Sequence, residues 1–567
     1  MTAPTDLQAS PAPETAGPTR PPLWQRAYRR LRDDRVTGWL ASLLITLLAF
    51  ALRIYHLGTP HEFEFDETYY AKDAWSLLHF GYARNYASTA NDQILAGHTT
   101  NQWESSPEMI VHPEVGKWLI AIGEKLWGMD PFGWRIASCV VGSLMILLMI
   151  RFVRRVTGSM LLGCVGGLLL CFDGLQFVLS RLGLLDIFLA FFVLLAVHCM
   201  VADRDHYRRR LARRVPTPLT RRRAWGPVWS VLFRPWLLAA GVAWGLAVGT
   251  KWEGAYPLAG FGILYVAWCA GARRGIGVRL SWVKALAADG VPAFLHLVLV
   301  AVIVYTATWT GWLMHAGQYE TSLSSTQYTH FTGTGHCEGQ NYVEDNPNDQ
   351  AHWPTVDQPE KHGVAGVLQN LESLWYYHRD VYTFHTHFLN CATHSYASKP
   401  SGWLLLNRPV SVAAENGIKP GQEGCDAPQG DTCLRQVVLL GTPVLWWGGC
   451  LAAIAALFFW IGARDWRFGV AIVGIATSWL TWLPYATRPI FSYYAIVTLP
   501  FLVLAVTLCI GKLLSRKDPG QRTLGVIISG AFFVLVLCNF AWFWPVYTND
   551  LLTRSEWLDR IWFKRWI

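Results

Sequence analysis

Long apolar stretches separated by shorter polar ones run through most of the chain. A helix that crosses a bilayer needs roughly 20 predominantly apolar residues, because its backbone polar groups find no water in the hydrocarbon. About eleven stretches meet this requirement: 37–56, 136–150, 156–172, 182–202, 236–250, 252–270, 288–312, 437–461, 468–483, 490–510 and 523–546. The pattern predicts an all-α polytopic membrane protein.

The first apolar stretch, 37–56, is predicted to remain as a span. It lies too far from the first residue and is too long for a cleaved signal peptide, and no small-residue cleavage site follows it. Residues 1–22 are rich in Pro, Ala and Thr and carry almost no large apolar side chains, so they cannot bury enough surface to fold alone. We therefore expect residues 1–36 to form a disordered, basic cytoplasmic tail.

The charges of the loops predict which side of the membrane each loop faces. The chain is 52% hydrophobic and 15% charged, with a net charge of +9. Its basic residues gather in every second loop, at 20–35, 151–155, 204–234, 273–279, 464–467 and 512–522. Cytoplasmic loops of membrane proteins carry an excess of Lys and Arg. These loops are therefore assigned to the cytoplasm.

The two long intervening loops are acidic. Residues 58–134 contain 11 Asp and Glu against 4 Lys and Arg, and residues 312–435 contain 13 against 6. We expect extracytoplasmic loops at 58–135 and 313–436. The other predicted parts are the first span at 37–57, further spans with short basic loops at 136–312, C-terminal spans at 437–546 and an interfacial tail at 547–567.

Two basic segments have competing interpretations. The arginines of 208–223 could bind nucleic acid, but a cytoplasmic loop beside anionic lipid headgroups needs no such partner. Membrane lipids are therefore expected partners, and nucleic acid is not. In residues 557–567 Trp, Phe and Ile alternate with Arg560, Lys564 and Arg565, which indicates an amphipathic segment at the outer interface.

Four of the 12 cysteines, Cys337, Cys391, Cys425 and Cys433, lie in the second acidic loop. This distribution fits an oxidising exterior. Cys425 and Cys433 are close enough in sequence for a small disulfide loop, which leaves Cys337 with Cys391, although four cysteines allow three pairings.

The first acidic loop opens with the adjacent carboxylates Asp66 and Glu67, about ten residues beyond the first span. Such a cluster fits catalysis, a cation site or a solvated loop face. Adjacent side chains diverge, by about 100° on a helix or to opposite faces of a strand. We expect one of the two to react and the other to position it.

Further ionisable and polar groups are predicted at the outward ends of the spans. Ionisable groups there are costly and usually functional or paired. Arg and Lys around an apolar groove suit a lipid-linked phosphate, although a lysine can also snorkel and Arg181 can pair with Asp186. The candidates for substrate or lipid-phosphate binding are His112, Lys117, Arg135, Arg181, Asp186, Lys251, Glu253, His385, His387, Arg488 and Tyr493.

Four nearby histidines, His378, His385, His387 and His394, raise the question of a metal. Their spacing matches no common zinc pattern and lacks a cysteine partner at a fixed distance. We expect hydrogen bonds to sugar, phosphate or loop backbone instead. No metal site and no cofactor are predicted, and a weak dependence on divalent metal stays open.

Several motifs, taken in order, resemble the protein O-mannosyltransferase family. They are Phe65-Asp-Glu-Thr-Tyr-Tyr-Ala-Lys-Asp-Ala-Trp75, His112-Pro-Glu-Val-Gly-Lys-Trp118, Ser180-Arg-Leu-Gly-Leu-Leu-Asp186 and Lys251-Trp252. Later motifs resemble the actinobacterial branch, so that the resemblance runs from about residue 37 to the C-terminus: Tyr376-Tyr-His-Arg379, Phe384-His-Thr-His387, His394-Ser-Tyr-Ala-Ser-Lys-Pro400 and Arg408-Pro-Val410. Two departures are a His112-Pro-Glu-Val-Gly116 motif where a His-Pro-Pro-Gly type is expected, and the lack of the long inserted outer domain of eukaryotic members.

The resemblance implies a GT-C type fold in the cell membrane and an extracytoplasmic active site. It implies transfer of mannose from a polyprenyl-phosphate carrier to Ser or Thr of exported proteins, with inversion from a β-linked donor to an α-linked product. The secretion translocon is a candidate partner.

A mechanism for such a reaction can be assigned as a hypothesis. A hydroxyl is a poor nucleophile until a base removes its proton, and we assign that role to Asp66, with Glu67 as its positioning neighbour. Charge growing on the phosphate would be met by Arg135, Arg181 or Lys251.

Other classes stay open. A GT-C enzyme that moves another sugar, such as arabinose, to a glycan or lipid would share the same acid pair. A transporter should show half-repeats and charges near the midplane. Here the charges cluster at the outer ends. A structural scaffold is a third alternative.

Overall fold

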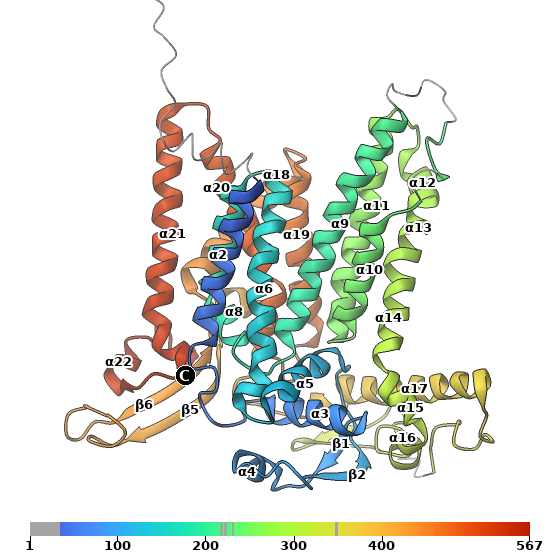
Figure 1. Ribbon diagram of the computed structural model, residues 1–567, viewed down its shortest axis with the longest axis vertical. Helices are drawn as coiled ribbons and strands as arrows, with labels where there is room; N and C mark the ends of the chain where they lie inside the picture. The colour runs from blue at the N-terminus through green and yellow to red at the C-terminus, as the bar shows by residue number, and fades with distance from the viewer. Residues whose placement is uncertain (1–34, 216–218, 220–223, 230–231, 346–349) are drawn as a thin grey trace, which may run out of the picture.

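The computed structural model describes residues 35–567 except 216–218, 220–223, 230–231 and 346–349. The predicted tail at 1–36 therefore lies, apart from its last two residues, outside the described residues. The described chain is mostly helical, with long helices side by side and a layer of shorter elements across one end (Figure 1).

Among the described residues, eight helical segments are long and apolar enough to cross a membrane. They are α2 (Arg35–Ile54), α6 (Pro131–Thr157), α9 (Asp186–Arg214), α11 (Ala255–Gly275), the run α12 (Ser281–Ala285), α13 (Val291–Phe294) and α14 (Val300–Thr308), α18 (Pro443–Ile461), α19 (Trp466–Trp479) with η7 (Leu480–Tyr485), and α21 (Pro519–Thr548). Three shorter apolar helices accompany them: α7 (Met160–Cys171), α10 (Pro235–Val248) and α20 (Leu499–Leu514). Each of the eleven predicted stretches overlaps one of these segments.

The bounds of α18 differ from the predicted span 437–461. Its first residue is Pro443, preceded by Thr442 in an extended conformation. Residues up to Leu439 belong to a strand, β6 (Cys433–Leu439), which pairs antiparallel with β5 (Val410–Ile418). Val437 and Val438 are β-branched and buried, so the apolar run of the sequence joins a strand to a helix.

The all-α prediction is wrong for the loops, whose described residues form three small antiparallel sheets. They are β1 (Arg84–Tyr86) with β2 (Trp103–Pro107), β3 (His336–Glu338) with β4 (Asn341–Val343), and β5 with β6 and β7 (Leu552–Thr553).

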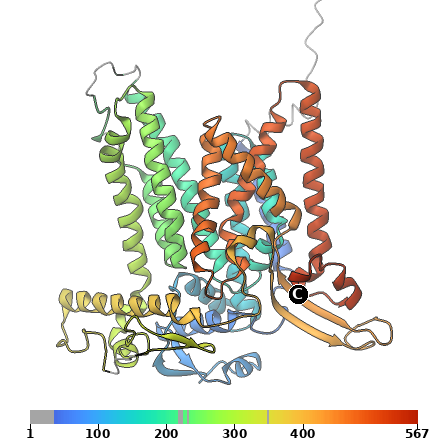
Figure 2. The ribbon, with the colours of Figure 1, turned by 180° about the vertical axis from the view of Figure 1, so that it is seen from behind.

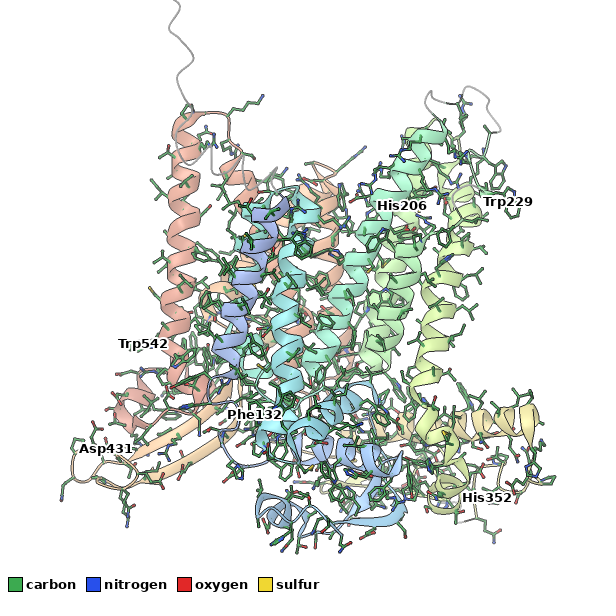
Figure 3. The ribbon with its side chains drawn as sticks, viewed as in Figure 1. Phe132, His206, Trp229, His352, Asp431 and Trp542 are labelled. Carbon is green, nitrogen blue, oxygen red and sulfur yellow. A yellow bond between two sulfur atoms is a disulfide. The ribbon has the colours of Figure 1, made fainter. Side chains whose placement is uncertain are left out.

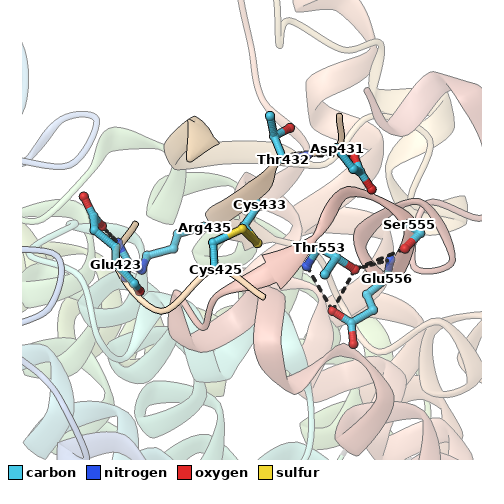
Figure 4. The surroundings of a disulfide bond; sticks show 9 residues. All are labelled: Glu423, Cys425, Asp431, Thr432, Cys433, Arg435, Thr553, Ser555 and Glu556. Carbon is cyan, nitrogen blue, oxygen red and sulfur yellow. Dashed lines mark hydrogen bonds and ion pairs between the residues drawn. A yellow bond between two sulfur atoms is a disulfide. The ribbon is translucent and has the colours of Figure 1, made fainter. Parts of the chain in front are cut away.

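The sheet of β5, β6 and β7 is tied together at its tip. A disulfide joins Cys425 to Cys433, and Arg435 of β6 forms an ion pair with Glu423 (Figure 4). β7 leads into α22 (Arg554–Leu558), which begins with a capping box between Thr553 and Glu556.

Short helices cross the end of the bundle that carries the candidate carboxylates. They are α3 (Glu67–Phe80), α4 (Ala90–Leu95), α5 (Val115–Trp127), α15 (Thr310–Met314), α16 (Ala316–Leu323) and α17 (Gly363–Thr386). Seen from behind, α17 lies across this end rather than along the bundle (Figure 2). His352 and Asp431 lie at the same end, whereas His206 and Trp229 lie at the opposite end (Figure 3). The described parts of the basic loop at 204–234 and of the acidic loop at 313–436 that carry these residues thus lie at opposite ends of the molecule.

Helix α9 begins with buried residues and carries a site residue at its first position. Its first residues, Asp186, Ile187, Phe188 and Leu189, are all buried. Because close packing leaves side chains little freedom, the Asp186 carboxylate is held in a fixed place at the end of the bundle where α3 lies.

Candidate active site

Asp66 and Glu67 lie at the start of α3, with Asp66 as the residue before the first helical turn. The preceding residue, Phe65, has φ 52°, a left-handed conformation that is costly for a bulky side chain. Its ring packs edge-on against Phe491 at 5.2 Å and Tyr493 at 5.9 Å between ring centroids. This packing holds the turn that places Asp66.

Glu67 is fully buried and all its acceptor positions are used. Its Oε1 accepts from Arg135 Nε at 2.8 Å and from the Gly183 amide at 2.7 Å. Its Oε2 accepts from Arg135 Nη2 at 2.7 Å and from the Glu64 amide at 2.9 Å. A carboxylate offers about four such positions. Glu67 therefore has no free oxygen lone pair for a substrate proton.

Arg135 is equally occupied. Besides its two bonds to Glu67, it donates from Nη1 to the carbonyls of Leu57 and Pro60 and from Nη2 to the carbonyl of Glu62. A guanidinium has five N–H groups, and these contacts use all of them. Arg135 thus fastens the segment between α2 and α3, and its expected contact with a lipid phosphate does not fit this geometry.

Arg181 has a similar role on the other side of the same segment. Its Nη1 donates to the carbonyls of Arg53 and Tyr55, and its Nη2 donates to the carbonyl of His56 at 3.2 Å. The pairing of Arg181 with Asp186 that the sequence allows does not occur. Arg181 instead fixes the outer end of α2, from which the chain runs on to Asp66.

Asp66 differs from its neighbour because the residue is only partly buried and its carboxylate is lightly bonded. Among the described side chains, the hydroxyl of Tyr70 donates to its Oδ2 at 3.3 Å. Burial raises the pKa of Asp66 to about 6, while the charge of Lys251 acts to lower it and the charge of Asp186 acts to raise it. Asp66 can therefore exchange a proton near neutral pH.

Lys251 and Asp186 form a buried ion pair beside Asp66. Lys251 Nζ lies 2.9 Å from each Asp186 carboxylate oxygen, and it lies 4.8 Å from the ring centroid of Tyr494. Burial alone would lower the pKa of Lys251, but the Asp186 carboxylate holds that pKa above its ordinary value. Lys251 remains a cation whose charge Asp186 largely balances.

Arg488 has a different kind of partner. Its Nη1 donates to His385 Nδ1 at 3.0 Å and to the His385 carbonyl at 3.1 Å, and in the described chain no carboxylate forms an ion pair with it. Its Nε is buried and has no hydrogen-bond partner among the described residues. Arg488 therefore offers an unbalanced positive charge at the site.

His385 is held in one tautomer. Burial, together with the charge of Arg488, lowers the pKa of His385 to about 4, so the ring is neutral. It accepts from Arg488 at Nδ1, and so its Nε2 carries the proton and donates to the Val111 carbonyl at 3.2 Å. His112 stacks on His385 at 5.7 Å between ring centroids, and burial holds the pKa of His112 well below its ordinary range.

The remaining predicted residues fall into two groups. Glu253 and Tyr493 lie with the cluster: Glu253 Oε1 and the Tyr493 hydroxyl are buried without a hydrogen bond in the described part of the chain. Lys117 and His387 contact other side chains, outside this cluster. Lys117 forms a buried ion pair with Asp73 at 2.8 Å, which joins α5 to α3, and His387 packs against Phe331 at 4.2 Å.

The four cysteines of the second acidic loop form two disulfides. Cys337 is bonded to Cys391, as Cys425 is to Cys433. Within the described ranges, no three His, Cys, Asp or Glu side chains are grouped as a metal site.

Tyr70 was not among the residues that the sequence singled out for the site. It lies four positions after Asp66, a spacing that brings side chains together on one face of a helix. That spacing was the available signal, because residues 67–80 are helical. The pairing of Asp186 with Lys251, 65 positions apart, had no such signal.

Family comparisons match nearly the whole chain. Residues 43–310 match the family described as dolichyl-phosphate-mannose-protein mannosyltransferase, and residues 370–566 match the C-terminal four-transmembrane region of protein-O-mannosyltransferase.

Three relatives carry the name polyprenol-phosphate-mannose--protein mannosyltransferase. Those of Mycolicibacterium smegmatis (strain MKD8) and Mycobacterium tuberculosis (strain H37Rv) are each 33% identical over 542 residues, covering 94% of this chain and 94% and 92% of the relatives. That of Corynebacterium glutamicum is 30% identical over 515 residues, covering 90% of this chain and 88% of the relative.

A solved structure shows the same fold. The S. cerevisiae protein O-mannosyltransferase Pmt1-Pmt2 complex bound to the sugar donor matches with a TM-score of 0.66 at 14% identity, over 96% of this chain and 94% of that chain. At this identity the likeness speaks for the fold alone. The two family matches and the 33% identity over 94% of the sequence establish that this chain belongs to the protein O-mannosyltransferase family.

Proposed function

We propose that this chain transfers mannose from a polyprenyl-phosphate-mannose donor to Ser or Thr hydroxyls of exported proteins, with Asp66 as the general base. The family and the printed names of the relatives support the donor and the protein acceptor. The observation that carries the role of Asp66 is the contrast between two adjacent carboxylates. Glu67 has four hydrogen bonds and is fully buried, whereas Asp66 is half-buried with a pKa of about 6.

The reaction is a single displacement at the sugar C1. As the acceptor oxygen attacks C1, Asp66 takes the proton of the acceptor hydroxyl, and the bond between C1 and the phosphate oxygen breaks. The polyprenyl phosphate leaves with the electron pair of that bond and needs no acid, because phosphate is already an anion. A general base works best when its pKa lies near the working pH, which a pKa of about 6 satisfies.

Arg488 is the cation that we assign to the phosphate. Arg135 uses all five of its N–H groups on Glu67 and on backbone carbonyls, Arg181 uses three of its five on backbone carbonyls, and Lys251 is balanced by Asp186. Arg488 keeps free N–H groups and no carboxylate, and neutral His385 orients it. A fixed guanidinium stabilises charge that develops on a leaving phosphate.

His112 completes the proposed site as a neutral ring available to a sugar hydroxyl. It lies 6.2 Å from Tyr70 and 5.7 Å from His385 between ring centroids. A neutral imidazole offers one donor and one acceptor, which suits a hydroxyl group better than an anion.

The membrane placement is part of the proposal. We infer a GT-C type fold with eleven spans in the cell membrane, and an extracytoplasmic site. Support comes from His206 and Trp229 of one basic loop, which lie at the end of the bundle opposite the short helices such as α3, and from the three shorter apolar helices, which together with the eight long ones match the eleven predicted stretches.

Purified protein in lipid nanodiscs tests the reaction. We expect radiolabelled mannose to pass from polyprenyl-phosphate-mannose to a Ser/Thr peptide, and little label to pass from polyprenyl-phosphate-arabinose or to a glycan acceptor. Equal or faster arabinose transfer, or label appearing on the glycan alone, would contradict the proposal. It would favour the alternative, a GT-C enzyme that moves another sugar to a glycan or lipid.

A further inference from the structure

A second polar-and-apolar site lies at the end of the bundle opposite Asp66. A groove of about 650 Å³ runs between α2, α6, α9 and α10. Its apolar wall is formed mainly by Leu144, Leu147, Leu148, Phe191 and Leu195. None of these residues belongs to the proposed mannose-transfer site.

The groove opens into a basic mouth. An adjoining pocket of about 530 Å³ is lined by Trp39, Arg151, Arg154, Arg155 and Arg209, and it shares all of these but Arg209 with the groove. Four arginines from two helices, α6 and α9, thus surround one end of the apolar groove.

The positive charge of this mouth is poorly balanced within the described residues. Asp205 is the acidic residue that lines the groove, and its Oδ2 lies 3.9 Å from Arg155 Nη1, beyond hydrogen-bond distance. The same carboxylate accepts from Arg204 at 3.1 Å. Arg151, Arg154 and Arg209 form no ion pair with the described carboxylates.

Two buried nitrogens at the groove also have no partner. Arg155 Nε and His198 Nδ1 are buried and make no hydrogen bond within the described part of the protein. Buried polar atoms are nearly always paired. Both residues line the groove, so a ligand there with oxygen acceptors would satisfy them.

Two tryptophans indicate the depth in the membrane at which the basic mouth of the groove lies. Trp39 near the start of α2 and Trp236 near the start of α10 are 45% and 42% exposed. The Arg151 guanidinium lies 3.9 Å from the Trp39 ring centroid, and that of Arg155 lies 5.8 Å from Trp236. Tryptophan concentrates at the headgroup level of membranes, so the four arginines lie where lipid phosphates lie.

We propose that this groove, defined by the residues above, binds an anionic phospholipid of the leaflet that the basic loops face. The phosphate lies among Arg151, Arg154, Arg155 and Arg209, and one acyl chain lies along the leucines. Basic pockets between membrane helices on the cytoplasmic side are known to take such headgroups. A soluble anion would leave the apolar wall empty, and a choline headgroup would bring a positive charge to the arginines.

Lipid binding by the full-length protein in detergent tests the site. Native mass spectrometry would titrate phosphatidylglycerol, with phosphatidylcholine as the zwitterionic comparison, against wild type and the double variant Arg151→Gln/Arg155→Gln. The matched control is Arg208→Gln/Arg213→Gln, because both arginines are exposed, lie on α9 and do not line the groove. The assay contains no sugar donor, so its result is independent of mannose transfer.

The expected loss is about five-fold for each groove arginine removed, or about 25-fold for the pair. The control pair should change the affinity less than about two-fold, since exposed charges that do not line the groove are screened by water and salt. Leu195→Trp, which fills the groove without changing charge, should also weaken phosphatidylglycerol binding. Unchanged melting temperatures show that the variants are folded.

Three outcomes would overturn the proposal. The first is wild-type affinity in the folded groove variant. The second is an equal loss in both arginine pairs, which would show a diffuse charge effect. The third is displacement of phosphatidylglycerol by polyprenyl phosphate at equal or lower concentration, which would assign the groove to the carrier lipid instead.

Discussion

At the residue scale, Asp66 and Glu67 show how environment separates two neighbouring carboxylates. The sequence predicts that adjacent side chains diverge, but it does not reveal which one reacts. That choice follows mainly from Arg135 and the Gly183 amide, which donate three of the four hydrogen bonds that saturate Glu67. Both partners lie far along the chain, and one is a backbone group with no residue signature.

The pKa of Asp66 predicts the pH dependence of transfer. A base must be unprotonated to act, and burial raises the pKa of this base to about 6. The rate of mannose transfer should therefore rise as pH increases through 6, with about a tenfold difference between pH 5 and pH 7. Initial rates at saturating donor would measure this, and a flat profile over that range would contradict the assignment.

Arg488 should matter more than any other cation of the site. Replacing Arg488 with Gln removes the charge that faces the leaving phosphate, and we expect kcat to fall by about 10²–10³-fold. Arg379→Gln is the matched control, because Arg379 is an outer-loop arginine 47% exposed beside Asp380. Steady-state kinetics with varied donor would compare the two variants. Equal activity of the two variants would remove Arg488 from the phosphate role.

At the element scale, the segment between α2 and α3 is held by arginines rather than by regular structure. Arg135 and Arg181 together bond to the carbonyls of residues 53, 55, 56, 57, 60 and 62. The sequence places both arginines at outward helix ends, as the structure does. It could not reveal their partners, because backbone carbonyls carry no sequence signal.

The buried pair of Glu67 and Arg135 should therefore contribute to stability. Arg135→Met leaves the Glu67 carboxylate buried and unpaired, and removing one partner of such a pair costs about 3–5 kcal/mol. We expect a clearly lower melting temperature for Arg135→Met and an unchanged one for Asp66→Asn, measured by thermal unfolding in detergent. The reverse order would show that Asp66, and not Glu67, anchors the loop.

The predicted span at 437–461 shows a limit of hydropathy at this scale. Val437, Val438 and Leu439 continue the apolar run, yet they belong to β6. Apolar periodicity alone does not separate a buried strand from a helix. Pro443 gives the local signal, since proline favours the first turn of a helix.

At the scale of the whole molecule, hydropathy and charge predicted the arrangement well. Each apolar stretch overlaps a described helix, and the described residues His206 and Trp229 of a basic loop lie at the end opposite His352 and Asp431 of the second acidic loop. The three small sheets of the described residues were missed because their strands are two to nine residues long and, apart from the apolar end of β6, lie in polar loops. Short strands with mixed polarity have no clear period.

Membrane sidedness can be tested on intact cells. Asp559→Cys places a thiol on an exposed site near the C-terminus, and Arg213→Cys places one at the exposed, basic end of α9. A membrane-impermeant maleimide should label the first in whole cells and the second only after permeabilisation. Labelling in the opposite pattern would invert the proposed topology and put Asp66 inside the cell.

The most direct test of the proposed mechanism is mannose transfer by Asp66→Asn in nanodiscs, with wild type and matched protein amounts. Asparagine keeps the shape of the side chain and cannot take a proton. The base assignment predicts a fall in kcat of about 10²–10⁴-fold, an unchanged melting temperature and little change in donor binding. Transfer by the folded Asp66→Asn protein within a few-fold of wild type would contradict the central claim that Asp66 is the base.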